Sequence, residues 1–212
     1  MNEKMENKLN NTKVVILGTA HGINVAGKRS PDGKFREYKF SREVIQMIKP
    51  KLETMGYIVY IDIIADVVPL PQSSELKKRV QIVNDICKKH GTANCIYVSI
   101  HNDAAGNGRE WHNAKGFSVH VSIVGSEKSK KLAKIFTSNA IRDDLCGNRS
   151  IPTCKYHSSN FYVLNNTICP AVLTENLFQD SKEDVDFLLS DKGKNAIVNL
   201  HVNSINEYFR TL

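Results

Sequence analysis

Short apolar runs alternate with longer amphipathic segments along most of the chain. Runs of strand length lie at 14–17, 57–64, 96–100, 117–124, 161–164 and 171–173. Segments of helix length, with apolar residues at three- and four-residue spacing, lie at 37–55, 74–90 and 126–143. Near the C-terminus, Ser181 and Asp184 resemble a capping box, and Gly193 interrupts the helical stretch that follows. Strands that alternate with helices in this way predict a layered α/β domain.

The apolar stripe of each predicted helix identifies its inward face. The stripes comprise Ser41, Val44, Ile45, Ile48, Leu52 and Met55 in the first helix, Leu76, Val80, Val83 and Cys87 in the second, and Leu132, Ile135 and Phe136 in the third. Glu37 opens the first helix on the same stripe. The helix dipole stabilises an acid in the first turn on any face, but a buried carboxylate without a cationic partner is costly. A divalent ion at the helix start would be a sufficient partner.

Two histidines each end an apolar strand and open an irregular loop. His21 precedes the loop 22–36, and His101 precedes the loop 102–115, which contains Trp111, the only tryptophan. Ligands of open α/β sheets bind outside the carboxyl ends of the strands, which is where both loops should lie. A single histidine at a strand end is more often structural than a ligand. The other five, His90, His112, His120, His157 and His201, lack this position altogether.

A second carboxylate, Glu175, ends the apolar run Pro170-Ala171-Val172-Leu173-Thr174. A salt bridge to one of the many lysines or arginines is an equally good explanation for this residue alone. A low-dielectric site would instead raise its pKa towards neutrality, which suits a general base. Two imidazoles, one carboxylate ligand and a further carboxylate are the components of a catalytic zinc site.

A competing motif occurs in the first loop, where residues 22–28 match the phosphate-binding pattern G-x-x-x-x-G-K. Arg29 follows in place of the Ser or Thr that would hold magnesium, and Pro31 and Gly33 prevent a helix from beginning there. The loop therefore lacks the helix N-terminus that binds the anion, and we interpret the match as chance.

Length and composition favour one domain. The 212 residues suffice for a single core, and no segment reaches the roughly 18 consecutive apolar residues of a membrane span. We expect a disordered segment at 1–12, without the features of a signal peptide, followed by one catalytic domain at 13–212 and synthesis in the cytoplasm. The five cysteines are odd in number and form no Cys-x-x-Cys pair, so we expect them to be reduced and mostly buried.

The formal net charge is +7, and it is spread along the chain in pairs such as Lys77 and Lys78. A basic surface favours an anionic polymer, either nucleic acid or a carboxylate-rich cell wall. Solvated helix faces explain any single pair better, so charge alone does not choose the partner.

Four motifs follow one another along the chain: His21-Gly22, Glu37, Ser99-Ile100-His101-Asn102, and the run from Pro170 to Phe178 that contains Glu175 and Asn176. Together and in this order they resemble the zinc-dependent N-acetylmuramoyl-L-alanine amidases of the amidase-3 type. The resemblance spans about residues 13–209. It implies a three-layer α/β sandwich with a mostly parallel, twisted central sheet flanked by helices.

The resemblance also implies a function and a site. His21, Glu37 and His101 match the residues that bind zinc in that family, with one Zn²⁺ per chain, and Glu175 matches the catalytic glutamate. The implied reaction is hydrolysis of the amide bond between N-acetylmuramic acid and L-alanine of peptidoglycan. Asn102, Arg29 and Trp111 are candidate substrate-binding residues. We expect peptidoglycan as partner, with no nucleic acid and no membrane insertion, and a monomer.

The sequence departs from the family at Leu17-Gly18-Thr19-Ala20, where an acidic residue is common, and at residues 106–115 and 149–160. One alternative is a zinc-dependent peptidase or other amide hydrolase that uses the same site. Another is a non-catalytic wall-binding module, which the spare carboxylate argues against. We expect a phage or prophage lysin, released to the wall by another factor, or else a wall-recycling enzyme.

Overall fold

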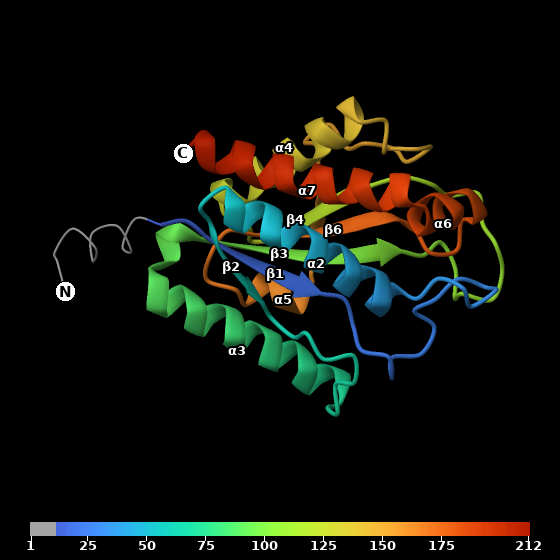
Figure 1. Ribbon diagram of the computed structural model, residues 1–212, viewed down its shortest axis with the longest axis horizontal. Coiled ribbons are helices and arrows are strands. Elements are labelled where there is room, and N and C mark those ends of the chain that lie inside the picture. Colours follow the sequence, from blue (N-terminus) through green and yellow to red (C-terminus); the bar gives the residue numbers. More distant parts are fainter. Residues whose placement is uncertain (1–11) are drawn as a thin grey trace, which may run out of the picture.

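The computed structural model describes residues 12–212, so all but one residue of the N-terminal segment expected to be disordered lies outside the described residues. The strands are β1 (Val14–Thr19), β2 (Ile58–Ile61), β3 (Cys95–Asp103), β4 (Ser118–Ser122), β5 (His157–Ser159) and β6 (Ala171–Phe178). The helices are α2 (Glu37–Thr54), α3 (Gln72–His90), the short 3₁₀ helix η1 (Thr92–Asn94), α4 (Glu127–Arg142), α5 (Tyr162–Asn165), α6 (Lys182–Leu189) and α7 (Asp191–Arg210). Figure 1 shows their arrangement.

The six strands form one sheet in the order β2-β1-β3-β6-β4-β5. β1 pairs in parallel with β2 and β3, and β3 pairs in parallel with β6. β4 runs antiparallel to β6, and β5 runs parallel to β4. The sheet is therefore mostly parallel, which confirms the predicted fold class. Since parallel strands end at the same edge, β1, β3 and β6 bring their carboxyl ends together.

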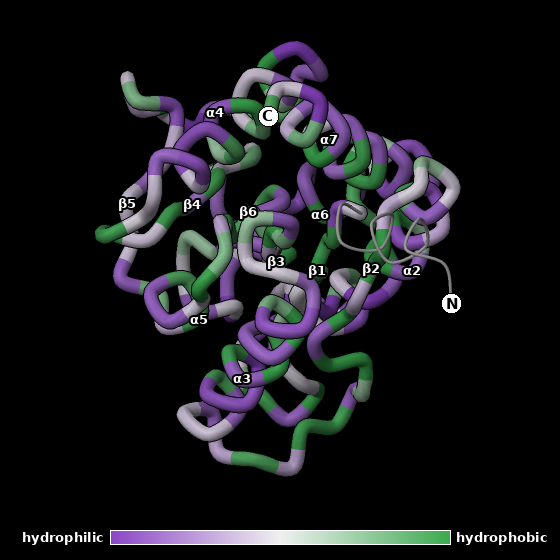
Figure 2. The backbone as a smooth tube through the Cα atoms, turned by 90° about the vertical axis from the view of Figure 1, so that its left-hand side faces the viewer, coloured by the Kyte–Doolittle hydropathy of each residue, from purple (hydrophilic) through white to green (hydrophobic). Residues whose placement is uncertain are grey.

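Helices cover both faces of this sheet, as the predicted three-layer sandwich requires. Alternate β1 residues point to opposite faces, and Val15 and Leu17 pack with apolar residues of α2, α4 and α7. Val14 and Ile16 pack on the other face with residues of α3 and α5. Figure 2 shows α3 on one side of the strands and α4 and α7 on the other. Burial on both faces explains why β1 is apolar without interruption.

Two predicted elements differ from the structure. The run 161–164, predicted as a strand, belongs largely to the helix α5, whose Val163 and Leu164 pack against the α3 face of the sheet. A run of four apolar residues is too short for its periodicity to distinguish helix from strand. The short strand β5 just before it was not predicted, because His157-Ser158-Ser159 carries no apolar pattern.

The C-terminal helices also begin differently from the prediction. Ser181 precedes α6 but makes no side-chain capping bond, and Asp184 accepts instead from the backbone N–H groups of Gly116 and Phe178. The break between α6 and α7 lies at Ser190, whose hydroxyl caps α7 by accepting from the Gly193 N–H. Gly193 is therefore inside a helix. Met55, placed on the buried stripe of α2, follows that helix and is 50% exposed.

The cysteines are free throughout the part of the chain that the structure describes. Cys87, Cys95 and Cys169 are buried, Cys146 is partly buried and Cys154 is exposed. Among residues 12–212, no helix is both long and apolar enough to cross a membrane.

Candidate active site

The four predicted site residues lie together at the carboxyl ends of β1, β3 and β6. His21 follows β1, and Glu37 is the first residue of α2. His101 and Glu175 are directly opposite each other in the pairing of β3 with β6. All four line one cavity of about 230 Å³. Residues separated by up to 154 positions in the sequence are thus neighbours because parallel pairing aligns the ends of their strands.

His21, Glu37 and His101 form a compact group of ligand atoms. Glu37 Oε1 lies 2.9 Å from His101 Nδ1 and 3.6 Å from His21 Nε2. The two imidazole rings are nearly perpendicular, with centroids 5.0 Å apart. One ligand atom from each of the three residues lies within 4.8 Å of the other two, and residues 12–212 contain no second group of this kind. Two nitrogens and one carboxylate oxygen are a donor set that zinc accepts.

The charge states of this group also suit a metal. Burial lowers the pKa of His21 to about 3, against the opposing charge of Glu37, so its imidazole is neutral and has a lone pair to donate. Burial alone would raise the pKa of Glu37, but the hydrogen bond with His101 and nearby positive charge, including that of Lys28, lower it to about 2. The second oxygen of Glu37, Oε2, is buried and has no hydrogen-bond partner. A cation would satisfy that oxygen, so the residues present fit the group that the sequence predicts.

Ser41 connects the two histidine-bearing strands to the helix that carries Glu37. Its hydroxyl accepts from the Ala20 N–H at 2.9 Å and donates to the carbonyl of Ile100 at 2.7 Å. This pairing explains why a polar residue occupies the buried stripe of α2. One turn of helix thereby fixes the backbone next to both His21 and His101.

His21 has a left-handed backbone conformation, with φ of +31°, which is unfavourable for a residue with a side chain. The buried guanidinium of Arg42 holds this turn. It donates to the carbonyls of Ala20 at 2.8 Å and His21 at 2.9 Å, and also to those of Tyr38, Ile64 and Ala65. The strain at a ligand is thus compensated by a side chain of α2.

Glu175 is buried and faces the same cavity from β6. Its Oε2 has no hydrogen-bond partner. Burial raises the pKa of this carboxyl well above its ordinary value, and the negative charges of Glu37 and Asp103 raise it further. Its neighbour Asn176 donates to the backbone carbonyl of His101 at 2.9 Å, which fixes β6 against β3 at this point. A carboxyl group with a raised pKa can exchange protons near neutral pH.

Comparison with known proteins identifies the fold and the family. The sequence model of Amidase_3, N-acetylmuramoyl-L-alanine amidase, matches residues 15–207. The chain belongs to this amidase family. Its activity is hydrolysis of the amide bond between N-acetylmuramic acid and L-alanine in peptidoglycan. No curated protein sequence matches the amidase.

Solved structures with the same fold include several amidases. An N-acetylmuramoyl-L-alanine amidase from Clostridium difficile 630 is 21% identical, with a TM-score of 0.78 over 94% of this chain and 98% of that one. The catalytic domain of CwlV from Bacillus (Paenibacillus) polymyxa var. colistinus is also 21% identical, with a TM-score of 0.75 over 94% and 99%. The catalytic domain of the CD27L endolysin, which targets Clostridia difficile, is 19% identical, with a TM-score of 0.66 over 92% and 97%. At these identities the likeness shows the fold.

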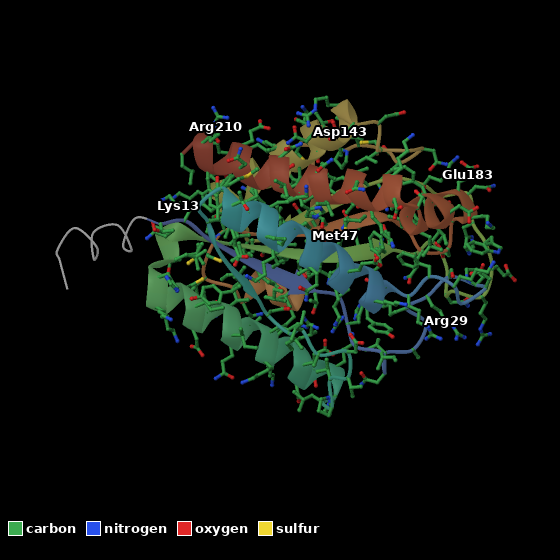
Figure 3. All side chains as sticks on the ribbon, viewed as in Figure 1. Lys13, Arg29, Met47, Asp143, Glu183 and Arg210 are labelled. Atoms are coloured by element: carbon green, nitrogen blue, oxygen red, sulfur yellow. The ribbon has the colours of Figure 1, made fainter. Side chains whose placement is uncertain are left out.

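The three candidate substrate-binding residues do not line the cavity of this amidase. Asn102 is buried, and its amide donates to the backbone carbonyl of Asn176. Arg29 is exposed on the loop between β1 and α2, where Figure 3 labels it. Trp111 is 37% exposed and lies on the loop after β3. The structure thus buries the Asn102 side chain between β3 and β6 and places the other two residues on loops.

Other residues that the sequence did not single out do line the cavity. Arg79 and Leu76 come from α3, Phe161 and Tyr162 from the start of α5, and Lys28 from the loop after β1. Of these, Leu76 lies on the predicted inward stripe of its helix and Lys28 ends the chance G-x-x-x-x-G-K match, whereas Phe161 and Tyr162 lie in the apolar run predicted as a strand.

Proposed function

We propose that His21, Glu37 and His101 hold one zinc ion in this amidase and that Glu175 carries the proton during hydrolysis. The observation that carries the proposal is the pair of buried carboxylate oxygens, Glu37 Oε2 and Glu175 Oε2, that face one cavity without a hydrogen-bond partner. Glu37 is within reach of two imidazoles, whereas Glu175 makes no salt bridge. One carboxylate therefore has the surroundings of a ligand and the other those of a base.

The protein's own residues prepare the site in distinct ways. Neutral His21 and hydrogen-bonded His101 present nitrogen atoms, and Glu37 supplies the negative charge that partly compensates a divalent cation. When bound, zinc supplies Lewis-acid polarisation of a carbonyl and lowers the pKa of water. Glu175 takes the proton that water loses as it attacks the lactyl carbonyl. The same carboxyl then donates that proton to the departing nitrogen of L-alanine. The products are the lactyl carboxyl group and the free amine of the stem peptide, and Glu175 returns to its starting state.

The deciding experiment is digestion of purified peptidoglycan with and without a chelator, with the cut bond identified by mass spectrometry. We expect cleavage between the lactyl group and L-alanine, abolished by the chelator and restored by zinc. Cleavage within the peptide stem would instead favour a zinc peptidase. Cleavage that persists without metal would contradict the zinc assignment.

The role of Glu175 has its own test. In Glu175→Gln the amide keeps the size of the side chain but cannot take up the proton. We expect one equivalent of zinc to remain bound while kcat falls by about 10²–10⁴-fold. Metal content is measured by elemental analysis on the same preparation that is assayed. Wild-type kcat in this variant would contradict the assignment of the base, and loss of zinc would make Glu175 a ligand instead.

We further propose that the enzyme works as a monomeric lysin that reaches the wall after release by another factor and has no nucleic-acid partner. One of the similar solved structures is the catalytic domain of an endolysin. Expression of the protein inside cells whose membrane is either left intact or permeabilised tests the release requirement. We expect lysis only of the permeabilised cells. Lysis of cells with an intact membrane would contradict the requirement for a separate release factor.

A further inference from the structure

Lys28 is a cation at the margin of the catalytic cavity without a committed partner. Besides the histidines, two basic side chains line this cavity, Lys28 and Arg79. Arg79 is fully engaged, because it donates to Glu75 at 2.8 and 3.0 Å, to Asp62 at 2.8 Å and to Thr19 at 3.0 Å. The Lys28 ammonium makes no hydrogen bond to any of residues 12–212, and its one ion pair is a 3.9 Å approach to Glu37 Oε2. That oxygen belongs to the group proposed to hold zinc.

The backbone holds Lys28 in place. Its carbonyl accepts a hydrogen bond from the N–H of Glu37 at 3.1 Å, which joins it to the first residue of α2. The next residue, Arg29, pairs with Arg36 in a short antiparallel bridge. The side chain of Lys28 is 37% exposed, so it borders both the cavity and solvent. A cation so anchored can meet a ligand without rearrangement of the loop, which reduces the entropic cost of binding.

Another part of the cavity lining is apolar and aromatic. Phe161 and Tyr162 at the start of α5 are 37% and 39% exposed, and Leu76 and Val163 complete an apolar surface. The site is therefore polarised, with a positive charge on the β1–α2 loop and an aromatic wall on α5. A ligand that fits both has an anionic group on one side of the scissile bond and an apolar or sugar ring face on the other.

We propose that Lys28 binds a carboxylate of the peptide stem, namely the α-carboxylate of the residue that follows L-alanine. The sugar side of the scissile amide carries neutral hydroxyl and acetamido groups, whereas the stem side carries free carboxylates. An ammonium with unused donors at the cavity margin recognises the charged group, because charge-assisted hydrogen bonds are roughly twice as strong as neutral ones. This inference rests on the proposed assignment of the site, and it makes Lys28 a substrate-binding residue that discriminates stems with a free carboxylate from amidated stems.

The test measures binding separately from turnover. The probes are two muramyl dipeptides whose second residue carries either an α-carboxylate or an α-carboxamide. Calorimetry gives the dissociation constants of both for the zinc-loaded Glu175→Gln variant, in which cleavage is suppressed. We expect the carboxylate form to bind about tenfold more tightly, the effect of one such contact. Adding Lys28→Met should reduce that ratio below about twofold, and Lys28→Arg should retain most of it.

A lysine on the same loop provides the matched control. The side chain of Lys34 is 76% exposed, its ion pair is with Asp32 at 3.8 Å, and it does not line the cavity. Lys34→Met should leave the ratio unchanged while it alters net charge to the same extent as Lys28→Met. Zinc content and circular dichroism are recorded for every variant.

Three results would overturn the role of Lys28: equal binding of the two dipeptides, no measurable binding of either, or an unchanged ratio in Lys28→Met. Wall digestion by the wild-type enzyme is measured in parallel. If that digestion proves independent of metal, the zinc site fails, whatever the binding ratio shows. If digestion behaves as expected but the ratio does not depend on Lys28, only the present inference fails.

Discussion

At the scale of single residues, the site depends on side chains that hold backbone and that touch no substrate. Arg42 donates to five backbone carbonyls, among them that of His21, and its Nε lies 3.3 Å from Asp66 Oδ1. The left-handed turn at His21 would otherwise relax towards a more favourable conformation. Arg42 therefore acts as a positioning residue for the first metal ligand.

Replacement of Arg42 should accordingly affect both stability and metal binding. In Arg42→Met several buried carbonyls lose their donor, and we expect the free energy of unfolding to fall by about 3 kcal/mol or more. Urea unfolding of the metal-free protein measures this loss, and titration with zinc should show affinity reduced at least about tenfold, as for other supports of metal ligands. Arg42→Lys keeps the charge but only part of the donor set, so its free energy of unfolding and its zinc affinity should lie between those of the wild type and Arg42→Met.

Lys39 offers a matched control for this substitution. It lies on the same helix, and Lys39→Met should change neither quantity, because Lys39 is exposed and borders the surface hollow beside Phe35 and Leu189. Equal zinc affinity in Arg42→Met and the wild type would show that the turn at His21 keeps its conformation without the guanidinium.

At the scale of elements, the junction of α6 and α7 illustrates what helix propensity cannot reveal. Gly193 lies in the first turn of α7 and is buried against the end of α6. A Cβ atom there would lie 1.9 Å from the carbonyl oxygen of Phe187 and 2.5 Å from its carbonyl carbon. Both atoms belong to the backbone, so the two helices would have to separate. Close approach of α6 to α7 therefore requires glycine at this position.

Gly193→Ala should destabilise the protein, although propensity alone predicts the reverse. Alanine favours a helix interior over glycine by about 1 kcal/mol. The steric conflict should outweigh this gain and give a net loss of about 1–3 kcal/mol, the usual range for overpacking. Thermal unfolding measures the difference. Lys192→Ala, an exposed neighbour in the same turn, should be close to neutral, and a stabilised Gly193→Ala would show that the helices can move apart freely.

The positions of residues within strands and helices determine which parts of the site the sequence could predict. His21, Glu37, His101 and Glu175 stand out because each is a polar group at the end of an apolar pattern, and parallel strands bring such ends together. Asn102 and Arg29, two of the candidate substrate contacts, adjoin His101 and Lys28 in the sequence. Successive residues of an extended chain point to opposite sides, so Asn102 faces away from His101, and Lys28 lines the cavity where Arg29 does not.

The contacts of the remaining histidines could not be predicted from the sequence. His201 is fully buried in α7, where it pairs with Thr174 and the Ile197 carbonyl. His120 stacks on His157 between β4 and β5. Residue type alone does not separate such structural histidines from ligands, and only the position of His21 and His101 at strand ends before a loop marked them in the sequence. The separation comes from tertiary contacts, which place only two of them beside Glu37.

At the scale of the whole molecule, the formal net charge of +7 favours association of the enzyme with its polymeric substrate, the cell wall. Charged side chains project around the periphery of the molecule, as Figure 3 shows, and Lys77 and Lys78 are exposed on α3, the helix that also walls the cavity. A dispersed positive field attracts an anionic wall over distances of about a Debye length, roughly 10 Å at 0.1 M salt. Chemistry inside the cavity depends on contacts much shorter than that.

Salt should therefore separate binding to the wall from cleavage of the bond. Between about 0.05 and 0.5 M NaCl we expect sedimentation with purified wall to weaken several-fold, because exposed charges are screened. A small soluble muropeptide contacts mainly the cavity and little of the outer surface, so its hydrolysis should change by less than about twofold over the same range. The double variant Lys77→Glu, Lys78→Glu lowers the net charge by four units next to the cavity and changes no residue that lines it. Its wall binding should be weaker at low salt and less sensitive to added salt. If salt altered muropeptide hydrolysis as strongly as wall binding, the basic surface would have to act on the chemical step itself, and the division between surface attraction and cavity chemistry would be wrong.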